Sequence, residues 1–242
     1  MTKRRSADAR NVDTSLPQTK PTLKLDWCDA KAATYAVKHW HYSETLPAGK
    51  NVYVGVWEDE NYVGCVIFGT GSGLVTDGRS YGLAPMQMAE LVRVALKAHR
   101  SPVSRIVKIA LKMLQTNSPG LRLVVSFADP FRGHHGGIYQ AGGWLFSGAT
   151  SPSKVFDIGG KIVHSRSFNG GKWMGAPKPV PANAKTLRVP GKYRYLMPLD
   201  DAMRLQLAPL AKPYPKRICA ASIDSDAPGF QPEEGSDVRT KC

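Results

Sequence analysis

The sequence predicts an α/β fold in which helices pack against a mixed β-sheet. Its centre holds an apolar β-rich run at residues 88–96, a segment with helical spacing at 99–115 and a strand of buried type at 121–129. A short helix and a closing strand are expected next, within residues 133–150. A strand, a helix and a second strand in close succession are typical of α/β enzymes, so a catalytic site is expected in this region.

The elements on either side follow from local patterns. A strand at 23–27 precedes an amphipathic helix at 29–40, and two β-rich runs that flank an acidic turn predict a hairpin over 51–70. A second hairpin over 154–168 turns at its paired glycines, Gly159 and Gly160.

Two helix positions are marked by the sequence. Ser101 is a candidate N-cap, and Pro102 stands where the first residue of the central helix is expected. A short amphipathic helix is expected over residues 200–210.

The formal net charge is +14, and most of the excess lies in one part of the chain. Residues 151–217 hold thirteen Lys and Arg but three Asp and Glu, with aromatic residues interleaved. Cations contact phosphates and aromatic rings stack on bases, so this composition favours nucleic-acid binding. A basic surface that only keeps the protein soluble is the alternative. The candidates for DNA contact are Lys172, Lys192, Arg194 and Arg204.

Secreted and membrane-spanning proteins are not expected from this sequence. The cysteines, at positions 28, 65, 219 and 242, form no CxxC pair and no zinc-site spacing, as expected of reduced thiols in a cytoplasm. No stretch approaches the roughly 20 apolar residues of a membrane helix, and the polar N-terminus lacks the apolar segment of a signal peptide.

The central strands and helices resemble the core of the GNAT N-acyltransferase fold. In that fold the phosphates of an acyl donor meet the start of one helix, and a tyrosine on the next helix acts near the leaving group. Residues 97–105 lack the Gly-rich phosphate loop typical of that superfamily and offer basic residues instead. The resemblance therefore implies the fold more firmly than a coenzyme A site, with Ser104 and Arg105 as candidate donor-binding groups.

Longer strings carry a closer resemblance. YAVKHWHYS, GVWEDENYVGCVIF, ELVRVAL, NSPGLRLVVSFAD and GHHGGIYQAG are similar to the Mom family of bacteriophage DNA-modification proteins, from about residue 25 to residue 217. The resemblance implies a phage or prophage enzyme in the host bacterial cytoplasm. It would convert adenine in DNA to a carbamoylmethyl derivative on the exocyclic amino group and so protect DNA from host restriction.

Residue chemistry and this resemblance together select the catalytic candidates. Removing a proton from the adenine amino group requires a base, which Asp129 at the end of a buried strand or His41 in a loop could supply. Tyr139 could protonate a leaving group. The resemblance adds Tyr42, and it also implies importance for Arg93, whose planar fork suits a carboxyl or phosphate group.

Three of these candidates have structural alternatives. Asp129 could cap a loop, Tyr139 could be a core residue with a satisfied hydroxyl, and Arg93 could form an ion pair with Glu90.

The adjacent histidines His134 and His135 are candidates for substrate contact. With Asp129 or His41 they could form a two-histidine, one-carboxylate iron site. A turn permitted by the following glycines, with one histidine touching substrate, is the favoured interpretation, so no metal ligand is assigned.

Four segments are expected along the chain. They are a disordered basic arm at 1–22, a GNAT-like catalytic domain at 23–174, a basic Pro-rich arm with a short helix at 175–218 and a disordered tail at 219–242. The third segment is expected to pack on the core or on DNA.

Double-stranded DNA is the expected partner, while the donor is left open between glycyl-tRNA, which would make tRNA a second partner, and a coenzyme A thioester. Glycyl transfer to the adenine amino group, followed by attack of the glycyl amine on the ring, would give the carbamoylmethyl product. Two other functions stay open: a CoA-dependent acyltransferase of a protein or small molecule, and a non-catalytic DNA-binding protein. A homodimer is also left open.

Overall fold

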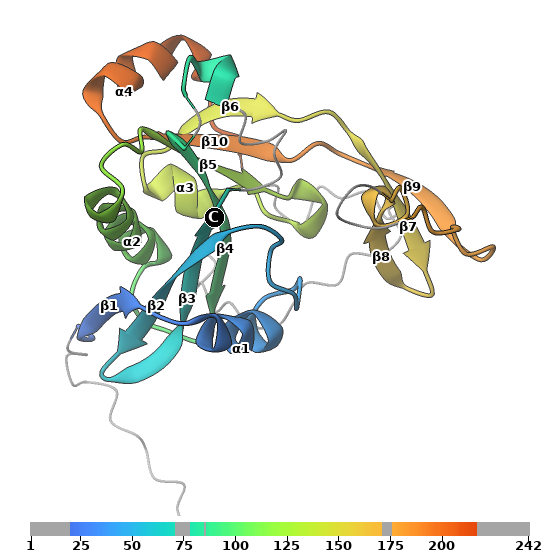
Figure 1. The fold of residues 1–242 in the computed structure, drawn as a ribbon, viewed down its shortest axis with the longest axis horizontal. Coiled ribbons are helices and arrows are strands. Elements are labelled where there is room, and N and C mark those ends of the chain that lie inside the picture. Colours follow the sequence, from blue (N-terminus) through green and yellow to red (C-terminus); the bar gives the residue numbers. More distant parts are fainter. Residues whose placement is uncertain (1–19, 71–77, 85, 171–175, 217–242) are drawn as a thin grey trace, which may run out of the picture.

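The computed structural model describes residues 20–70, 78–84, 86–170 and 176–216, and a seven-stranded sheet forms their centre (Figure 1). Its strands are β1 (Leu23–Trp27), β2 (Asn51–Glu58), β3 (Asn61–Gly69), β4 (Met88–Leu96), β5 (Leu123–Ala128), β6 (Leu145–Ala149) and β10 (Tyr193–Pro198). The strand order is β1-β2-β3-β4-β5-β10-β6, in which β4 and β5 are parallel and the other neighbours antiparallel. The mixed α/β sheet expected from the sequence is confirmed.

Helices cover both faces of this sheet. In the described part of the chain the α-helices are α1 (Ala30–Trp40), α2 (Val103–Asn117), α3 (Gly137–Ala141) and α4 (Asp201–Leu207). Successive strand residues point to opposite faces, so β5 places Val124 in the core with α2 and α3, and Leu123 and Val125 in the core with α4. By the same alternation β3 places Cys65 and Ile67 against α1. Helices α1 and α4 therefore share one face, opposite α2 and α3.

Local chemistry accounts for the β2–β3 hairpin and for α1. The turn residues Asp59 and Glu60 have φ values of 46° and 66°, the left-handed conformation that two-residue hairpin turns require. Asp29 caps α1 by accepting the N–H of Ala32 at 2.8 Å. Both elements lie where the sequence predicted them.

The parallel strands β4 and β5 separate partway along their length. They pair only from Met88 opposite Leu123 to Leu91 opposite Ser126. The β3–β4 register shifts at this point, which leaves Val92 as an extra residue in β4. The sheet therefore opens at the carboxyl ends of its parallel pair, where open α/β sheets commonly bind ligands.

The expected boundary at residue 174 does not divide the sheet. Strand β10 lies between β5 and β6, and its Tyr195 and Leu196 are fully buried, so these residues belong to the core rather than to an arm. The close approach of Gly191 to β6 helps this insertion, because a Cβ there would lie 1.6 Å from the carbonyl oxygen of Thr150. The sequence obscured this because β10 is remote from β5 along the chain.

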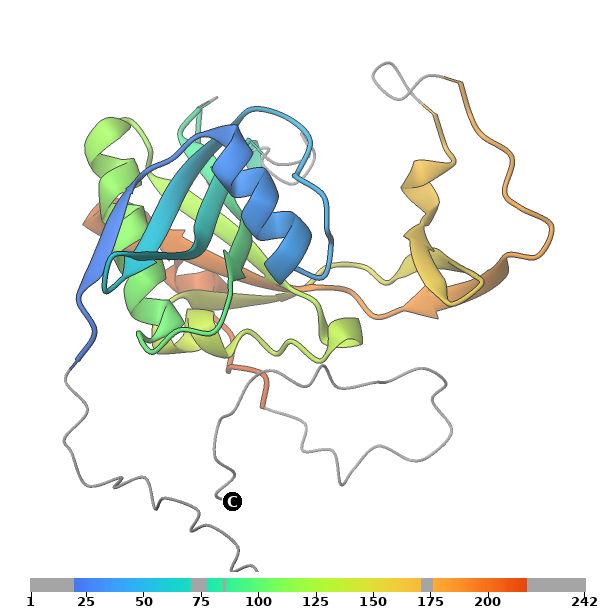
Figure 2. The same cartoon turned by 90° about the horizontal axis from the view of Figure 1, so that it is seen from below.

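A second sheet projects from the core (Figure 2). It consists of β7 (Ser153–Ile158), β8 (Lys161–His164) and β9 (Lys185–Val189), in the order β8-β7-β9. The β7–β8 hairpin was expected, whereas β9 falls in the stretch expected to be part of the basic Pro-rich arm. Pairing with β7 gives this Pro- and Lys-rich stretch an extended ladder that its composition alone did not predict.

Four short 3₁₀ turns complete the described fold: η1 (Gly78–Tyr81), η2 (Pro130–Arg132), η3 (Ser165–Ser167) and η4 (Ala208–Leu210). Helix α4 with η4 covers the expected helical region near the end of the core. Within the described ranges, none of the helices is long and apolar enough to cross a membrane. The expected basic arm, apart from residues 20–22, and the expected tail beyond residue 216 lie outside the described residues.

Candidate active site

Five sequence-predicted side chains converge where β4 and β5 separate. We call them the polar cluster: His41, Tyr42, Arg93, Asp129 and His134. The first two follow the end of α1, Arg93 lies on β4, and the last two follow β5. The rings of His41 and Tyr42 stack with centroids 4.3 Å apart, and the Tyr42 ring lies 5.9 Å from that of His134.

Ser43 connects the histidine to the arginine. Its hydroxyl oxygen lies 2.8 Å from Nδ1 of His41 and accepts a hydrogen bond from Nε of Arg93 at 3.0 Å. Nη1 of Arg93 donates to the carbonyl oxygen of Val92 at 2.8 Å, at the bulge in β4. These two bonds hold the guanidinium fork in one orientation.

His41 is a neutral hydrogen-bond donor in this arrangement. Its burial, together with the positive charge of Arg93 and the proximity of His134, lowers the pKa of His41 from 6.5 to about 4. The backbone N–H of Ser43 donates to Nδ1 at 3.1 Å, so the single hydrogen of the neutral ring lies on Nε2. A histidine in this state donates from Nε2 and is poorly suited to accept a proton there.

Tyr42 is accessible although its hydroxyl is enclosed. About 42% of the residue is exposed, and the guanidinium of Arg132 lies 5.6 Å from its ring centroid. Burial of the phenol raises the pKa of Tyr42; the charge of Arg93 opposes this rise, and that of Asp129 adds to it. The phenol therefore stays protonated at neutral pH and can donate a hydrogen bond.

Asp129 supplies the carboxylate of the polar cluster. One oxygen accepts the N–H of Phe131 at 3.1 Å, which caps η2, and the other lies 3.5 Å from Nζ of Lys192. The predicted capping role is therefore present. It engages only one oxygen directly, and the other faces a flexible lysine in a weak ion pair.

The adjacent histidines His134 and His135 are placed differently by the turn at Gly136. Gly136 has φ of +84°, and a Cβ there would lie 2.3 Å from the ring of Tyr195. The Tyr195 hydroxyl donates to the carbonyl oxygen of His135 at 2.5 Å, which anchors this turn. As a result His134 faces Tyr42, whereas the backbone of His135 is tied to the core.

Tyr139 lies beneath the polar cluster, within the core. It is 8% exposed and packs against Trp144 and Tyr195. Its hydroxyl oxygen is 2.7 Å from the Ser126 hydroxyl, which lies 2.8 Å from the carbonyl oxygen of Leu91. A serine has one hydroxyl hydrogen, so it accepts from Tyr139 when it donates to Leu91. Burial raises the pKa of Tyr139 to about 12.

The start of α2 is organised by a glutamate that sequence reasoning missed. The buried Glu58 accepts the N–H groups of Arg100 and Ser101 at 2.8 and 2.6 Å. Pro102, rather than Ser101, occupies the N-cap position, and the Ser101 hydroxyl has no hydrogen-bond partner among the described residues. The predicted serine cap was wrong because a carboxylate from β2 takes over the loop before the helix.

The predicted donor-binding residues Ser104 and Arg105 lie in the first turn of α2, at this closed loop. Ser104 is partly buried and Arg105 is exposed. No hydrogen bond or ring contact joins either residue to the polar cluster in the described structure. Ser104 and Arg105 therefore stay a prediction as donor-binding residues.

The basic candidates lie on different elements, and one of them contacts the polar cluster. Lys192 reaches Asp129, Arg194 follows two residues later on β10, and Arg204 is exposed on α4. Lys172 lies outside the described residues.

Ser43, Ser126 and Arg132 complete the site and were not predicted. No sequence pattern marks them, because each acts through a neighbour that the fold brings close. Among the described residues no group of three or more His, Cys, Asp or Glu is placed so that it could hold a metal ion.

Three solved structures resemble this fold. They are the spermidine/spermine N-acetyltransferase SpeG from Vibrio cholerae (TM-score 0.43, 10% identity, 76% of this chain and 96% of that one), the N-acyl amino acid synthase FeeM from uncultured soil microbes (0.44, 13%, 80% and 99%) and a probable GNAT-family acetyltransferase from Chromobacterium violaceum (0.42, 12%, 81% and 97%).

Sequence comparison is more specific. The methylcarbamoylase Mom of Escherichia phage Mu is 28% identical over 211 residues, covering 80% of this chain and 84% of that protein. The sequence profile of the Mom protein family matches residues 22–216, which include every residue of the polar cluster. The chain belongs to the Mom protein family.

Proposed function

We propose that this chain is a DNA-modifying transferase that attaches a carbamoylmethyl group to the exocyclic amino group of adenine. The observation that carries the proposal is the polar cluster, in which one carboxylate and several hydrogen-bond donors meet where the parallel strands separate. Family membership and the name of the phage Mu relative support the same reaction. The enzyme would act in the cytoplasm of a bacterial host.

The chemistry of adenine explains the need for such a cluster. The lone pair of its amino nitrogen is delocalised into the ring, so attack on an acyl carbon requires a proton acceptor and a polarised carbonyl. Asp129 is the candidate acceptor, because its oxygen beside Lys192 makes no other hydrogen bond among the described residues. We assign the acceptor role to Asp129 rather than His41, whose low pKa and Nε2–H tautomer suit donation.

The remaining groups suit stabilisation of the acyl oxygen and the leaving group. Arg93 is held by Ser43 and Val92, so little reorganisation is required when negative charge develops nearby. Tyr42 donates from a protonated phenol. Tyr139, whose buried hydroxyl is bonded to Ser126, is proposed as a positioning residue that holds Ser126 against the backbone of β4 beneath these groups.

The donor is proposed to be an aminoacyl ester such as glycyl-tRNA. The N–H groups before α2, which would be the natural seat for donor phosphates, are already bonded to Glu58. A coenzyme A donor that used this loop would have to displace a buried carboxylate. Competition between purified glycyl-tRNA and a glycyl thioester of coenzyme A in a single-turnover assay tests the choice, and modification with only the thioester would reverse it.

A two-step route gives the product without any other reactant. The adenine amino nitrogen first attacks the glycyl carbonyl and releases the donor's oxygen or sulfur, leaving an amide with a free glycyl amine. That amine then attacks the ring carbon, and the original nitrogen departs as the terminal amide. With ¹⁵N in the adenine amino group, the label should appear in the carbamoyl group, whereas label retained on the ring excludes this route.

The first experiment is mass spectrometry of nucleosides from DNA of bacteria that express this chain. A new adenine species of carbamoylmethyl mass is expected for the wild type and for Lys112→Gln, whose exposed side chain lies on α2. The species should be absent with Asp129→Asn, which keeps a good capping residue but removes the negative charge. Resistance of the same DNA to restriction endonucleases tests the protective role.

This experiment also separates the rival functions. Ordinary adenine in every sample, with folded wild-type protein present, would reject DNA modification in that host. Binding to duplex with steep salt dependence would then favour a DNA-binding protein. Saturable binding of coenzyme A would favour an acyltransferase of another substrate. The target base would have to leave the duplex stack to reach the polar cluster, as is usual for enzymes that act on bases.

A further inference from the structure

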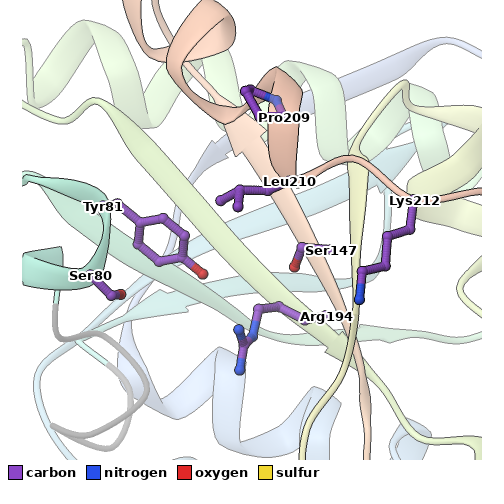
Figure 3. Close-up of a pocket in the computed structure, with 7 residues that line it drawn as sticks. All are labelled: Ser80, Tyr81, Ser147, Arg194, Pro209, Leu210 and Lys212. Atoms are coloured by element: carbon purple, nitrogen blue, oxygen red, sulfur yellow. The ribbon is translucent and has the colours of Figure 1, made fainter.

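A second polar site lies beside α4, at some distance along the sheet from the polar cluster. It is an open cavity of about 360 Å³ whose walls come from four parts of the chain (Figure 3). We call it the Arg194 pocket. It is lined by Arg194 of β10, Lys212 after η4, Ser80 and Tyr81 of η1, Ser147 of β6, and Pro209 and Leu210 of η4.

The chemistry of the Arg194 pocket is that of an anion site. Its polar lining consists of a guanidinium, an ammonium and three hydroxyl groups, and no lining residue is acidic. The hydroxyl oxygen of Ser147 is buried and has no hydrogen-bond partner among the described residues. A buried hydroxyl normally has a partner, so a ligand that accepts its hydrogen bond would complete the pocket.

The fold holds the second cation in place. The backbone N–H of Lys212 donates to the carbonyl oxygen of Phe146 at 2.8 Å, and the hydroxyl of Tyr214 donates to that of Trp144 at 2.7 Å. The Lys212 side chain lies over Gly148, where φ is +101° and a Cβ would lie 3.1 Å from Nζ. The glycine therefore leaves room for the ammonium group.

The opposite wall is also fixed. The side-chain amide of Gln206 in α4 donates to the carbonyl oxygen of Tyr81 at 2.7 Å, which holds η1 against the helix. In Figure 3 the Tyr81 hydroxyl and the Arg194 guanidinium lie on the same side of the pocket, with Lys212 across from them.

The Arg194 pocket and the polar cluster share one face of the sheet. Arg194 alternates with Tyr195 and so points toward the α4 side, as Leu196 does. Arg93 lies on the same side, two residues from Ala95, which packs against α1. Lys192, two residues before Arg194 and about 7 Å away along the strand, reaches Asp129. Strand β10 therefore leads from one site to the other.

We propose that the Arg194 pocket binds a backbone phosphate of the DNA strand whose adenine enters the polar cluster. This inference rests on the proposed function and adds a binding site to it. Arg, Lys, Ser and Tyr side chains are common phosphate ligands, and such contacts position nucleic acid without reading its sequence. The walls formed by Tyr81 and Leu210 offer apolar surface for the adjoining sugar. The pocket would fix the distance between the strand and Asp129.

A cycle of protein and DNA changes tests this assignment. Duplexes that carry one neutral methylphosphonate linkage at successive positions near the target adenine are bound by the wild type, Arg194→Gln, Lys212→Gln and the control Lys112→Gln. At one position the neutral linkage should weaken wild-type binding by about tenfold, the scale of one charge-assisted hydrogen bond. Arg194→Gln should weaken binding of unmodified DNA by a similar factor, yet show no further loss at that position. Lys112→Gln should behave as the wild type.

The alternatives give different results. Losses that multiply at every position, with Arg194→Gln as fully folded as wild type by circular dichroism, overturn the phosphate assignment. Unchanged DNA affinity with a tenfold higher KM for the donor also overturns it, because the pocket would then hold a phosphate of the donor. Either result can occur while carbamoylmethyl adenine is still formed, so failure of this inference is distinguishable from failure of the proposed function.

Discussion

Two polar regions flank β4, and they satisfy their hydrogen-bonding groups in different ways. At the start of α2, each oxygen of the Glu58 carboxylate accepts a hydrogen bond, one from the N–H of Arg100 and one from that of Ser101. In the polar cluster, Nε and Nη1 of Arg93 donate to Ser43 and Val92. One oxygen of Asp129 accepts from Phe131, and the other lies 3.5 Å from Nζ of Lys192. Both oxygens of Glu58 are held by backbone hydrogen bonds, whereas one oxygen of Asp129 has only a long ion pair with an exposed lysine. That difference favours the polar cluster as the reaction centre.

The largest expected effect on the modification rate comes from changing Arg93 of the polar cluster. Arg93→Lys keeps the charge, but an ammonium cannot reproduce the planar fork that contacts Ser43 and Val92 together. We expect modification to slow by about 10²–10³-fold, the usual cost of losing one preorganised donor. Single-turnover rates with normal DNA binding would show it. A rate within threefold of wild type would mean that the polar cluster is not the reaction centre.

Changing Glu58 at the start of α2 should lower the stability of the protein rather than its modification rate. Glu58→Ala leaves buried N–H groups without partners, so we expect a loss of about 2–4 kcal/mol in the free energy of unfolding. Urea unfolding at neutral pH measures it. Modification per folded molecule should stay near the wild-type level. A tenfold change in donor affinity at full folding would instead make the start of α2 a donor site.

The same variant has a pH dependence of known sign. Burial acts to raise the pKa of Glu58, but hydrogen bonds from Ser101 and Arg100 outweigh it, and the pKa lies below its ordinary 4.5. The contribution to stability is therefore complete above the unfolded pKa and is lost as pH falls through the lower folded value. The gap between wild type and Glu58→Ala should narrow in acid. A gap that widens there would contradict this account.

In the polar cluster, His41 should also make the stability of the protein depend on pH. Its folded pKa of about 4 lies below the unfolded 6.5, so protonation favours the unfolded state. Stability should be complete above pH 6.5 and should fall between 6.5 and 4, by on the order of 1–3 kcal/mol after allowance for solvent screening. Urea unfolding of His41→Gln across this range should lack that part of the decline. Wild-type modification rates should show no inflection at pH 6.5 from this residue.

The smallest effect on the modification rate is expected at Arg105, an exposed residue in the first turn of α2. Arg105→Gln should reduce modification by less than about threefold, because an isolated surface charge contributes little beyond long-range attraction. Steady-state kinetics with donor and DNA varied separately measure it. A tenfold rise in KM for the donor alone would restore Arg105 as a donor-binding residue, as the sequence analysis expected.

The fold was predictable wherever a pattern is local. The hairpin of β2 and β3 and helix α1 follow from side-chain periodicity and turn residues within each segment. The insertion of β10 between β5 and β6 was not predictable, because it depends on pairing between residues such as Leu123 and Pro198 that are far apart in the chain. The strand β9 was obscured by Pro- and Lys-rich composition.

The site shows the same limit. The members of the polar cluster were selected from residue chemistry and family strings, and the structure brings them together. Tyr139 was selected as well, but as a buried group whose contact with Ser126 no pattern reveals. Glu58 looks like an ordinary hairpin acid in the sequence, yet it organises a helix start on another segment. The Arg194 pocket is formed by four segments that are far apart in the chain, so no single sequence motif predicts it.

The position of β10 has a consequence for how the protein is synthesised. A ribosome releases β5 and β6 well before the strand that separates them in the finished sheet, so the nascent chain carries two unpaired edges while the projecting sheet is being made. A premature stop before residue 193 would leave these edges exposed in an aggregation-prone fragment rather than yield a shorter enzyme. Lys192 and Arg194 also reach their places only then, so the phosphate contact proposed for Arg194 could form only after translation has passed β10.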